Sequence, residues 1–339
     1  MIGKGVYEES GRKISPTSLQ RIVERVARQC KTPLEMSEEL RPRWDEFLLV
    51  DEKMGRVKGK QQWWYICVDR TGDIVDCSAV KELTVNEAIR FLEEVKGLGA
   101  QWRGVVTDLD TALTLAVEHV FTGIPHQYCL KHALSAIEDQ IGYTAMGRRQ
   151  RCNRKGLRDE FERLPGRKGV WVERAREEFY KRLEQVRTLS KRFKQIKSLR
   201  DGCHAILFAR DEEQAREHFR ALRRTRRRYP VCEYGKVIAF FERHWKRLMA
   251  YHRVPGLPRT NNLVENVNKQ IQRRLKTIES FQYRHTAIDY MNLLVAYLRC
   301  KPYTDCRRGR KHLNGKCRLQ AAHVRKLSSD WLANCLKPA

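Results

Sequence analysis

Three acidic residues stand where a divalent-metal site would need them. Asp51 ends the apolar run 47–50 and Asp108 follows the apolar run 105–107, so both come at the ends of predicted strands. Glu265 lies in a stretch with helical periodicity. Carboxylates on such elements can hold two divalent ions, and two ions about 4 Å apart can activate a nucleophile and stabilise the leaving oxygen of a phosphodiester. The three acids therefore predict metal-dependent cutting and joining of nucleic-acid strands.

The choice of ligand at each strand end depends on the register. Glu52 follows Asp51 directly, and Asp110 lies two residues beyond Asp108. Either residue is the ligand instead if the strands are shifted from the expected register. A single aspartate after a strand is a weak signal, so the combination with the segment 260–265 carries the hypothesis.

The chain has a large excess of positive charge. Its 339 residues include 68 Lys and Arg against 41 Asp and Glu, giving a net charge of +27 and a pI near 9.9. Lys and Arg contacts to phosphate supply most of the sequence-independent affinity of proteins for nucleic acids. The composition predicts DNA as the partner, with a merely basic or ribosome-associated protein as the alternative.

The sequence shows no sign of a membrane or secretory segment. No run approaches the roughly 20 apolar residues of a transmembrane helix, and the N-terminus has no apolar stretch typical of a signal peptide. We expect no membrane partner and a cytoplasmic location, nucleoid-associated if the protein is prokaryotic. The eleven cysteines are then expected to be reduced thiols.

Strand and helix patterns alternate through the first half of the chain. Strands are predicted at 47–50, 63–68, 74–80, 104–107 and 125–129, and helices at 84–95 and 111–121. This order is that of an RNase H-like core, an α/β fold built on a mixed five-stranded sheet. The first and fourth strands are neighbours in such a core, so Asp51 and Asp108 are expected to meet at one end of the sheet.

The remaining sequence reads mostly as basic helices. We therefore expect five segments: an N-terminal helical segment (1–44), the first part of the RNase H-like core (45–135), an all-helical basic insertion (136–254), the second part of the core with the Glu265 helix (255–299), and a basic, loosely ordered C-terminal tail (300–339).

The N-terminal segment begins with a helix start signal, because Ser15 can cap a helix whose first residue is Pro16. Its apolar stripe comprises Leu19, Ile22, Val23 and Val26. Arg21 and Arg25 lie off the stripe and are candidates for DNA contact. The segment fits either a partial helix-turn-helix or a basic linker helix.

Four sequence motifs together resemble a known family. The matching segments are 49–51, 105–108, 126–132 and 259–265. They are similar to those of the DDE transposases of the Mutator-like (MULE) group and of related prokaryotic insertion-sequence transposases, over about residues 45 to 295. The last two motifs are the most specific.

The resemblance implies a mechanism, cofactors and partners. Asp51, Asp108 and Glu265 would be the catalytic acids and would bind Mg²⁺ or Mn²⁺, as two ions. Water would attack the phosphodiester at an element end, and the released 3′-OH would attack target DNA. The partners would be the element's terminal repeats, target DNA and a second copy of the chain. Only about forty residues precede the core, where the family usually has a fuller DNA-binding region, so a truncated or domesticated DNA-binding protein without catalytic activity is the alternative.

Cys129 and His132 have the spacing of half a zinc site. A complete site needs about four ligands, and no second pair stands nearby, so zinc is disfavoured. The tail holds a separate set: Cys306, His312, Cys317 and His323. The family carries a Cys-x-x-His where this chain has Cys129 and His132, which implies a supporting role for these two residues near the active site. The alternative is a buried thiol and a core histidine.

The helix that carries Glu265 is expected to begin at a capping Asn262 and to end near Ile278. Asn261 and Asn262 are taken as supporting residues of the site. Four basic residues border it and suit phosphate contacts: Arg259, Lys269, Arg273 and Arg274. Trp245, in the helical insertion, could stack on a base at the cut DNA end. The alternatives are a solvated basic face and a core tryptophan.

A serine or tyrosine recombinase is the competing enzyme class. It would need a covalent nucleophile among a fixed set of Arg and His, and Arg284-His285 is the only hint of one. Metal dependence separates the two classes, because those recombinases need no metal.

Overall fold

The computed structural model describes residues 15–163 and 170–337, without the side chains of 160–163, 170–175 and 308. The chain forms two compact units. One combines the residues up to Gln127 with those from Gly256 onward, and the other runs from Tyr128 to Pro255.

A mixed five-stranded sheet lies at the centre of the first unit, in the order β3-β2-β1-β4-β5. β1 pairs antiparallel with β2 and parallel with β4, and β2 pairs antiparallel with β3. The strands are β1 (Phe47–Val57), β2 (Lys60–Asp69), β3 (Ile74–Val80), β4 (Gly104–Thr107) and β5 (His126–Tyr128). The expected α/β class with a mixed five-stranded sheet is confirmed.

The first strand is longer than the apolar pattern predicted, and it forms a hairpin with the second. The prediction ended the first strand at Val50, whereas β1 continues to Val57 and pairs with β2 down to Lys60. Lys58 and Gly59 make the two-residue turn with φ of 48° and 74°. Both values lie in the left-handed region that a type I′ hairpin turn requires and that glycine adopts without strain. The extension carries charged residues and therefore lacks an apolar signature.

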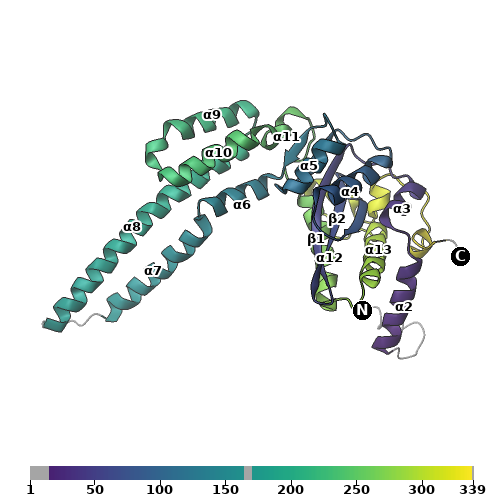
Figure 1. Ribbon diagram of the computed structural model, residues 1–339, viewed down its shortest axis with the longest axis horizontal. Coiled ribbons are helices and arrows are strands. Elements are labelled where there is room, and N and C mark those ends of the chain that lie inside the picture. The colour runs from purple at the N-terminus through teal and green to yellow at the C-terminus, as the bar shows by residue number, and fades with distance from the viewer. Residues whose placement is uncertain (1–14, 164–169, 338–339) are drawn as a thin grey trace. The chain divides into compact units, whose positions relative to one another are not determined.

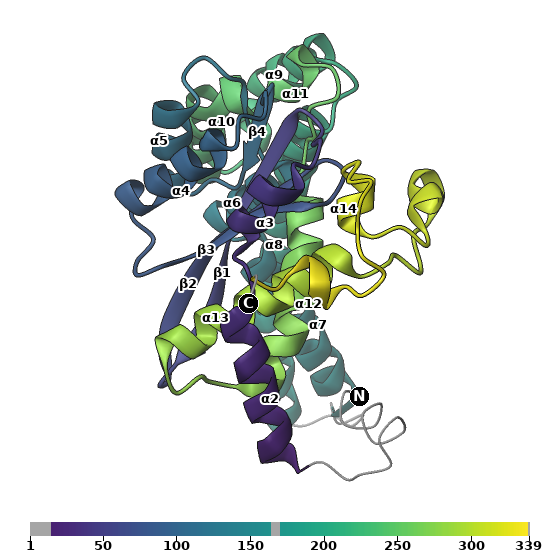
Figure 2. The same cartoon turned by 90° about the vertical axis from the view of Figure 1, so that its right-hand side faces the viewer.

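Helices cover both faces of the sheet (Figure 2). α4 (Val85–Gly97) and α5 (Thr111–Val120) pack on one face, where Phe91 and Leu113 join the buried cluster around Val50. α12 (Asn262–Ile278) and α13 (Arg284–Cys300) lie on the other. The predicted helices at 84–95 and 111–121 are thus present within a residue or two of their expected bounds.

The N-terminal helices pack against the same unit. Ser15 caps α2 (Pro16–Gln29), its side chain accepting a hydrogen bond from the Ser18 N–H at 3.0 Å, as predicted. α2 runs beside α13 (Figure 2), and α3 (Pro33–Leu40) contacts β3. One residue of the predicted apolar stripe is not packed: Ile22 is 47% exposed. The buried residues at the end of α2 are Ala27 and, directly after the helix, Cys30.

The C-terminal tail is not loosely ordered, and that expectation is wrong. Short helical turns order it: η2 (Arg308–Leu313), α14 (Arg318–Ala321) and η3 (Leu332–Asn334). Leu319 and Cys335 are fully buried in a cluster with Met36 of α3. Arg318 is 4% exposed and donates to the Leu298 carbonyl. The charge pattern hid the tail's few buried apolar side chains.

One ion pair is buried completely where these elements meet. Arg299 of α13 and Asp73, at the β2–β3 turn, have no exposed side-chain surface and join through two hydrogen bonds of 3.0 and 2.7 Å. The guanidinium also donates to the Pro33 carbonyl and to the Ser37 hydroxyl of α3, both at 3.0 Å. The Trp44 indole N–H donates to Asp73 at 3.0 Å.

The second unit is helical. It consists of α6 (Leu130–Gln140), α7 (Tyr143–Arg163), α8 (Val170–Leu207), α9 (Glu212–Arg224), η1 (Arg226–Arg228), α10 (Val231–Leu248) and α11 (Ala250–Arg253). α7 and α8 form a long pair that lies side by side, and α9 and α10 pack beside the C-terminal part of α8 (Figure 1). None of the described helices in either unit is long and apolar enough to cross a membrane.

Replacing Arg299 by leucine should destabilise the first unit strongly. The change leaves the Asp73 carboxylate buried without its cation, which costs about 3–5 kcal/mol of the free energy of unfolding. Urea unfolding followed by tryptophan fluorescence measures the loss. Arg103→Leu is the control, because its 2.6 Å pair with Glu46 is exposed on both sides and contributes at most about 1 kcal/mol. Equal, small losses for both variants would contradict the role given to the buried pair.

Candidate functional site

The register of the parallel strands brings two predicted acids together. Phe47 lies opposite Gly104 and Leu49 opposite Val106, and the same offset places Asp51 opposite Asp108. β4 ends at Thr107 while β1 continues, so the two carboxylates stand at the point where the pairing stops.

A third carboxylate joins them. Oxygen atoms of Asp51, Glu52 and Asp108 all lie within 4.8 Å of one another, and all three residues are partly buried. Glu52 was predicted as the alternative to Asp51 as the ligand on this strand. In the structure both carboxylates belong to the same group, so their positions do not exclude either.

Asp110, the alternative on the other strand, has a different position. Its Oδ1 accepts a hydrogen bond of 2.8 Å from the Leu113 N–H and so caps α5. Its own backbone N–H donates to Asp108 Oδ1 at 3.0 Å, which orients the neighbouring carboxylate. Thr107, whose hydroxyl lies 2.8 Å from His126 Nε2, donates to the Asp108 carbonyl at 2.7 Å.

The electrostatics of the group suit a cation. Burial, and then the negative charges of Asp108 and Asp51, raise the pKa of Glu52 to about 8. Its Oε2 is buried and has no hydrogen-bond partner among the described residues. Crowded carboxylate oxygens are the ligands that Mg²⁺ and Mn²⁺ prefer. The donor set therefore fits a divalent ion of this class.

Helix α12 is attached to β1 at Asp51 and at the residue before it. Asn261 donates from its amide to the Val50 carbonyl at 2.8 Å, and Asn268 donates to Asp51 Oδ2 at 2.8 Å. Residues 261, 265 and 268 follow the i, i+4, i+7 spacing of one helix face. Glu265 thus stands between the two attachment points, on the face of α12 that meets β1.

Glu265 itself is partly buried, with 19% of its side chain exposed and Lys269 Nζ 3.9 Å from its Oε2. It does not belong to the group of Asp51, Glu52 and Asp108 oxygens within 4.8 Å in the described part of the chain. The structure therefore brings two of the three predicted acids together and places the third on the adjoining helix.

The far end of α12 is also tied to β1. Phe281, three residues past the helix, donates its N–H to the Arg56 carbonyl at 2.9 Å and accepts from the Lys58 N–H at 2.8 Å. Between the ends, Lys53 donates to the Gln272 side chain.

The expected cap of this helix is wrong by one residue. α12 begins at Asn262, which is exposed, and Asn261 occupies the N-cap position. Asn261 makes no side-chain cap hydrogen bond, because its amide is directed to Val50 across the sheet. Sequence reasoning also missed Asn268, although its position three residues after Glu265 places it on the same helix face.

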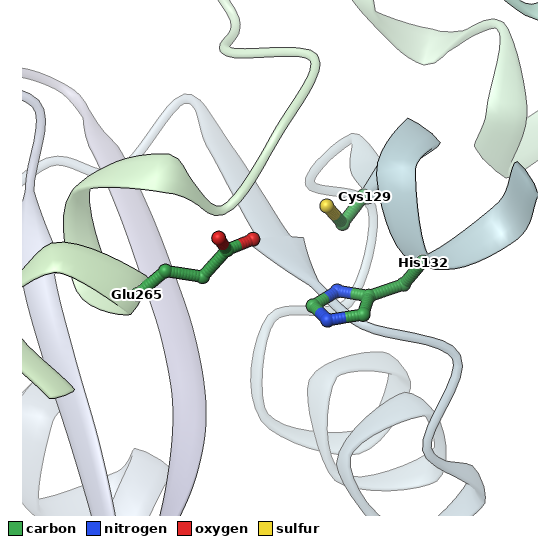
Figure 3. A group of neighbouring side chains, drawn as sticks. All are labelled: Cys129, His132 and Glu265. Atoms are coloured by element: carbon green, nitrogen blue, oxygen red, sulfur yellow. The ribbon is translucent and has the colours of Figure 1, made fainter. Parts of the chain in front are cut away.

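Cys129 and His132 lie at the beginning of α6 in the second unit. Cys129 is fully buried at the N-cap position without a side-chain cap, and His132 follows in the first turn, half-buried. Figure 3 draws both at this helix start, with Glu265 in the first turn of α12. The other predicted set does not gather in the described chain: His312 and His323 are exposed, whereas Cys317 is buried.

The residues expected to touch DNA are mostly exposed: Arg21, Arg25, Arg259, Lys269, Arg273 and Arg274. Trp245 differs. Its ring packs against Phe219 and Phe241, its indole N–H donates to Glu212 Oε1 at 3.2 Å, and Arg216 lies over the ring. Trp245 is therefore packed against neighbouring side chains of the helical unit.

Comparison with known families adds a decisive observation. The family model described as "Transposase, Mutator family" matches residues 184–300. The chain carries a Mutator-family transposase region. This match confirms the resemblance inferred from the motifs. A search of curated proteins finds no match.

The transposase match covers the helical unit from within α8 and the helix that carries Glu265, and it ends with α13. Asp51 and Asp108 lie outside the matched range. Their assignment therefore depends on the register of β1 and β4 and on the hydrogen bond from Asn268.

Removing the Asn268 amide should weaken any binding of a divalent metal ion by the carboxylates of Asp51, Glu52 and Asp108. Groups that orient a metal ligand typically contribute about 10–100-fold to affinity, so we expect Asn268→Ala to lower the affinity for Mn²⁺ about tenfold. Electron paramagnetic resonance of unbound Mn²⁺ measures the change. Asn266→Ala is the matched control, because Asn266 is exposed on the same helix. Equal affinities in the two variants would show that Asn268 does not position a ligand.

Proposed function

We propose that this protein is a DDE transposase that cuts DNA at the ends of a mobile element and joins those ends to target DNA. The observation that carries the proposal is the group formed by Asp51, Glu52 and Asp108 at the open end of the β1–β4 pairing. It lies in a chain with a Mutator-family transposase region that includes the Glu265 helix.

In this proposal the carboxylates divide the work of holding two divalent ions. Asp51 and Asp108 are shared ligands, Asn268 fixes the orientation of Asp51, and Glu265 completes one site from α12. Glu52 remains a candidate ligand because its carboxylate lies in the same group. When bound, two such ions activate the attacking hydroxyl and stabilise the leaving oxygen. The strand order and the pairing of β1 with β4 support an RNase H-like core as the scaffold.

The proposed partner is DNA. The net charge of +27 favours a polyanion, and Lys269, Arg273 and Arg274 are exposed on the helix that carries Glu265. Phosphate contacts from this helix would hold a DNA strand beside the carboxylates. Two ends must be joined in one reaction, so we propose at least a dimer on DNA, in line with the family resemblance.

Neutralising a catalytic acid should abolish the reaction while leaving DNA binding nearly intact. We expect Asp108→Asn and Glu265→Gln to lose metal-dependent cleavage and joining, with DNA affinity within a few fold of the original. The assay is strand transfer with DNA carrying the ends that flank the gene, in Mg²⁺ or Mn²⁺, beside a binding measurement.

Asp110→Asn is the matched control for these variants. Asparagine caps helices as well as aspartate does, so α5 stays capped and activity should persist. Loss of activity in Asp110→Asn but not in Asp108→Asn would reverse the assignment of the ligand. Specific DNA binding by the original protein without any metal-dependent cleavage would instead support a domesticated DNA-binding protein.

Removing Arg273 and Arg274 together should weaken binding to all DNA sequences alike. Each lost phosphate contact should lower the slope of log affinity against log salt by about 1. Fluorescence anisotropy with an unrelated duplex over a salt series measures the slope. The double lysine variant keeps both charges and should retain the original slope. An unchanged slope in the double alanine variant would place the DNA elsewhere.

A further inference from the structure

Four cysteines far apart in the sequence converge in the first unit. Cys30 follows the last residue of α2, Cys300 ends α13, Cys317 precedes α14, and Cys335 follows η3. Cys30, Cys317 and Cys335 are at most 4% exposed in one buried cluster, and Cys300 packs against it. Each cysteine therefore stands at the end of a different element.

The closest pair has the spacing of metal-bound sulfurs. Cys300 Sγ and Cys335 Sγ are 3.8 Å apart. Tetrahedral zinc with Zn–S bonds of about 2.3 Å separates its sulfur ligands by about 3.8 Å, whereas a disulfide needs about 2.05 Å. The observed separation is too long for a covalent bond; it is that of a thiol–thiol hydrogen bond and equally that of two sulfur ligands of one ion.

The backbone brings Cys30 to the same place. Residue 30 forms a β-bridge with Leu336, and the Lys31 N–H donates to the Cys335 carbonyl at 2.8 Å. This short ladder fixes the end of α2 beside the C-terminal turn.

Cys317 shows a second property of metal-binding thiols. Its sulfur accepts a backbone N–H from Gln320 in a capping box, while the Gln320 side chain accepts from the Cys317 N–H at 2.9 Å. Backbone N–H groups directed at sulfur stabilise the thiolate, which is the form that binds metal.

The charges around the cluster are consistent with this reading. Burial first, and then Cys300, raise the pKa of Cys30 to about 12. Burial raises the pKa of Cys317 and Cys300 adds to it, the hydrogen bond with Cys300 raises the pKa of Cys335, and the same hydrogen bond lowers the pKa of Cys300. The four sulfurs therefore lie close enough to act on one another electrostatically.

We propose that Cys30, Cys300, Cys317 and Cys335 form a structural zinc site that fastens the C-terminal tail to the ends of α2 and α13. Zinc and other thiophilic ions prefer such an all-sulfur set. No three of these sulfurs lie within 4.8 Å of one another in the described chain, so binding draws the side chains of Cys30 and Cys317 inward. On binding, each thiol releases its proton, which leaves a net charge of −2 on the ion and its four thiolates.

The test is the zinc content of the purified full-length protein, measured by mass spectrometry of the metals after exposure to zinc chloride and gel filtration. We expect about one zinc ion per chain, with strong loss in Cys300→Ser and in Cys335→Ser. Cys152→Ser and Cys232→Ser are matched controls, because both cysteines are exposed in the other unit, and they should keep the ion.

A measurement on the unaltered protein guards against variants that fail to fold. A strong zinc chelator should remove the ion and make the tail after Cys300 more sensitive to limited proteolysis, and added zinc should restore protection. No bound zinc, zinc that persists in both serine variants, zinc lost only in Cys129→Ser, bound iron with sulfide, or a Cys300–Cys335 disulfide in the isolated protein would each overturn the proposal.

Discussion

The buried pair of Arg299 and Asp73 is the interaction on which the first unit depends. Two charges without solvent contact are tolerated only because each finds several hydrogen bonds. The guanidinium reaches α3 through the Pro33 carbonyl and Ser37, and Asp73 also receives the Trp44 indole. The pair therefore fixes α13 and the N-terminal helices against the turn that joins β2 to β3.

That constraint reaches the carboxylates through the sheet. β2 pairs with β1 from Leu48 to Val57, so the turn anchored by Arg299 also sets the position of the strand that carries Asp51 and Glu52. α12 then uses two asparagine amides to hold its own place beside that strand. Buried amides without partners are unfavourable, so these hydrogen bonds make the helix position specific. The proposed site is thus built on strands and a helix instead of on loops, which favours a fixed geometry.

Local patterns in the sequence were enough to predict the sheet but not its attachments. The apolar runs at β1 and β4 predicted the strands, and the register followed once these two strands were taken as neighbours. The charged end of β1 was not predicted as strand, because hairpin pairing and not burial makes it one. The order of the tail was not predicted, because it comes from a few side chains, such as Leu319, that are buried by elements distant in sequence. Asn261 was predicted to support the site, but its hydrogen bond to the Val50 carbonyl was not predicted, because only the folded chain shows where its amide points.

The double attachment of α12 to β1 has a geometrical consequence. The 17 residues of the helix span about 25 Å at 1.5 Å per residue. The strand from Val50 to Val57 covers about 23 Å at 3.3 Å per residue. Helix and strand are therefore similar in length and are joined near both ends, which prevents either from shifting along the other. One residue added to or removed from α12 before position 265 would turn that position by about 100° around the axis. Chain length, as much as chemistry, therefore determines that a glutamate stands on the same face of α12 as Asn268.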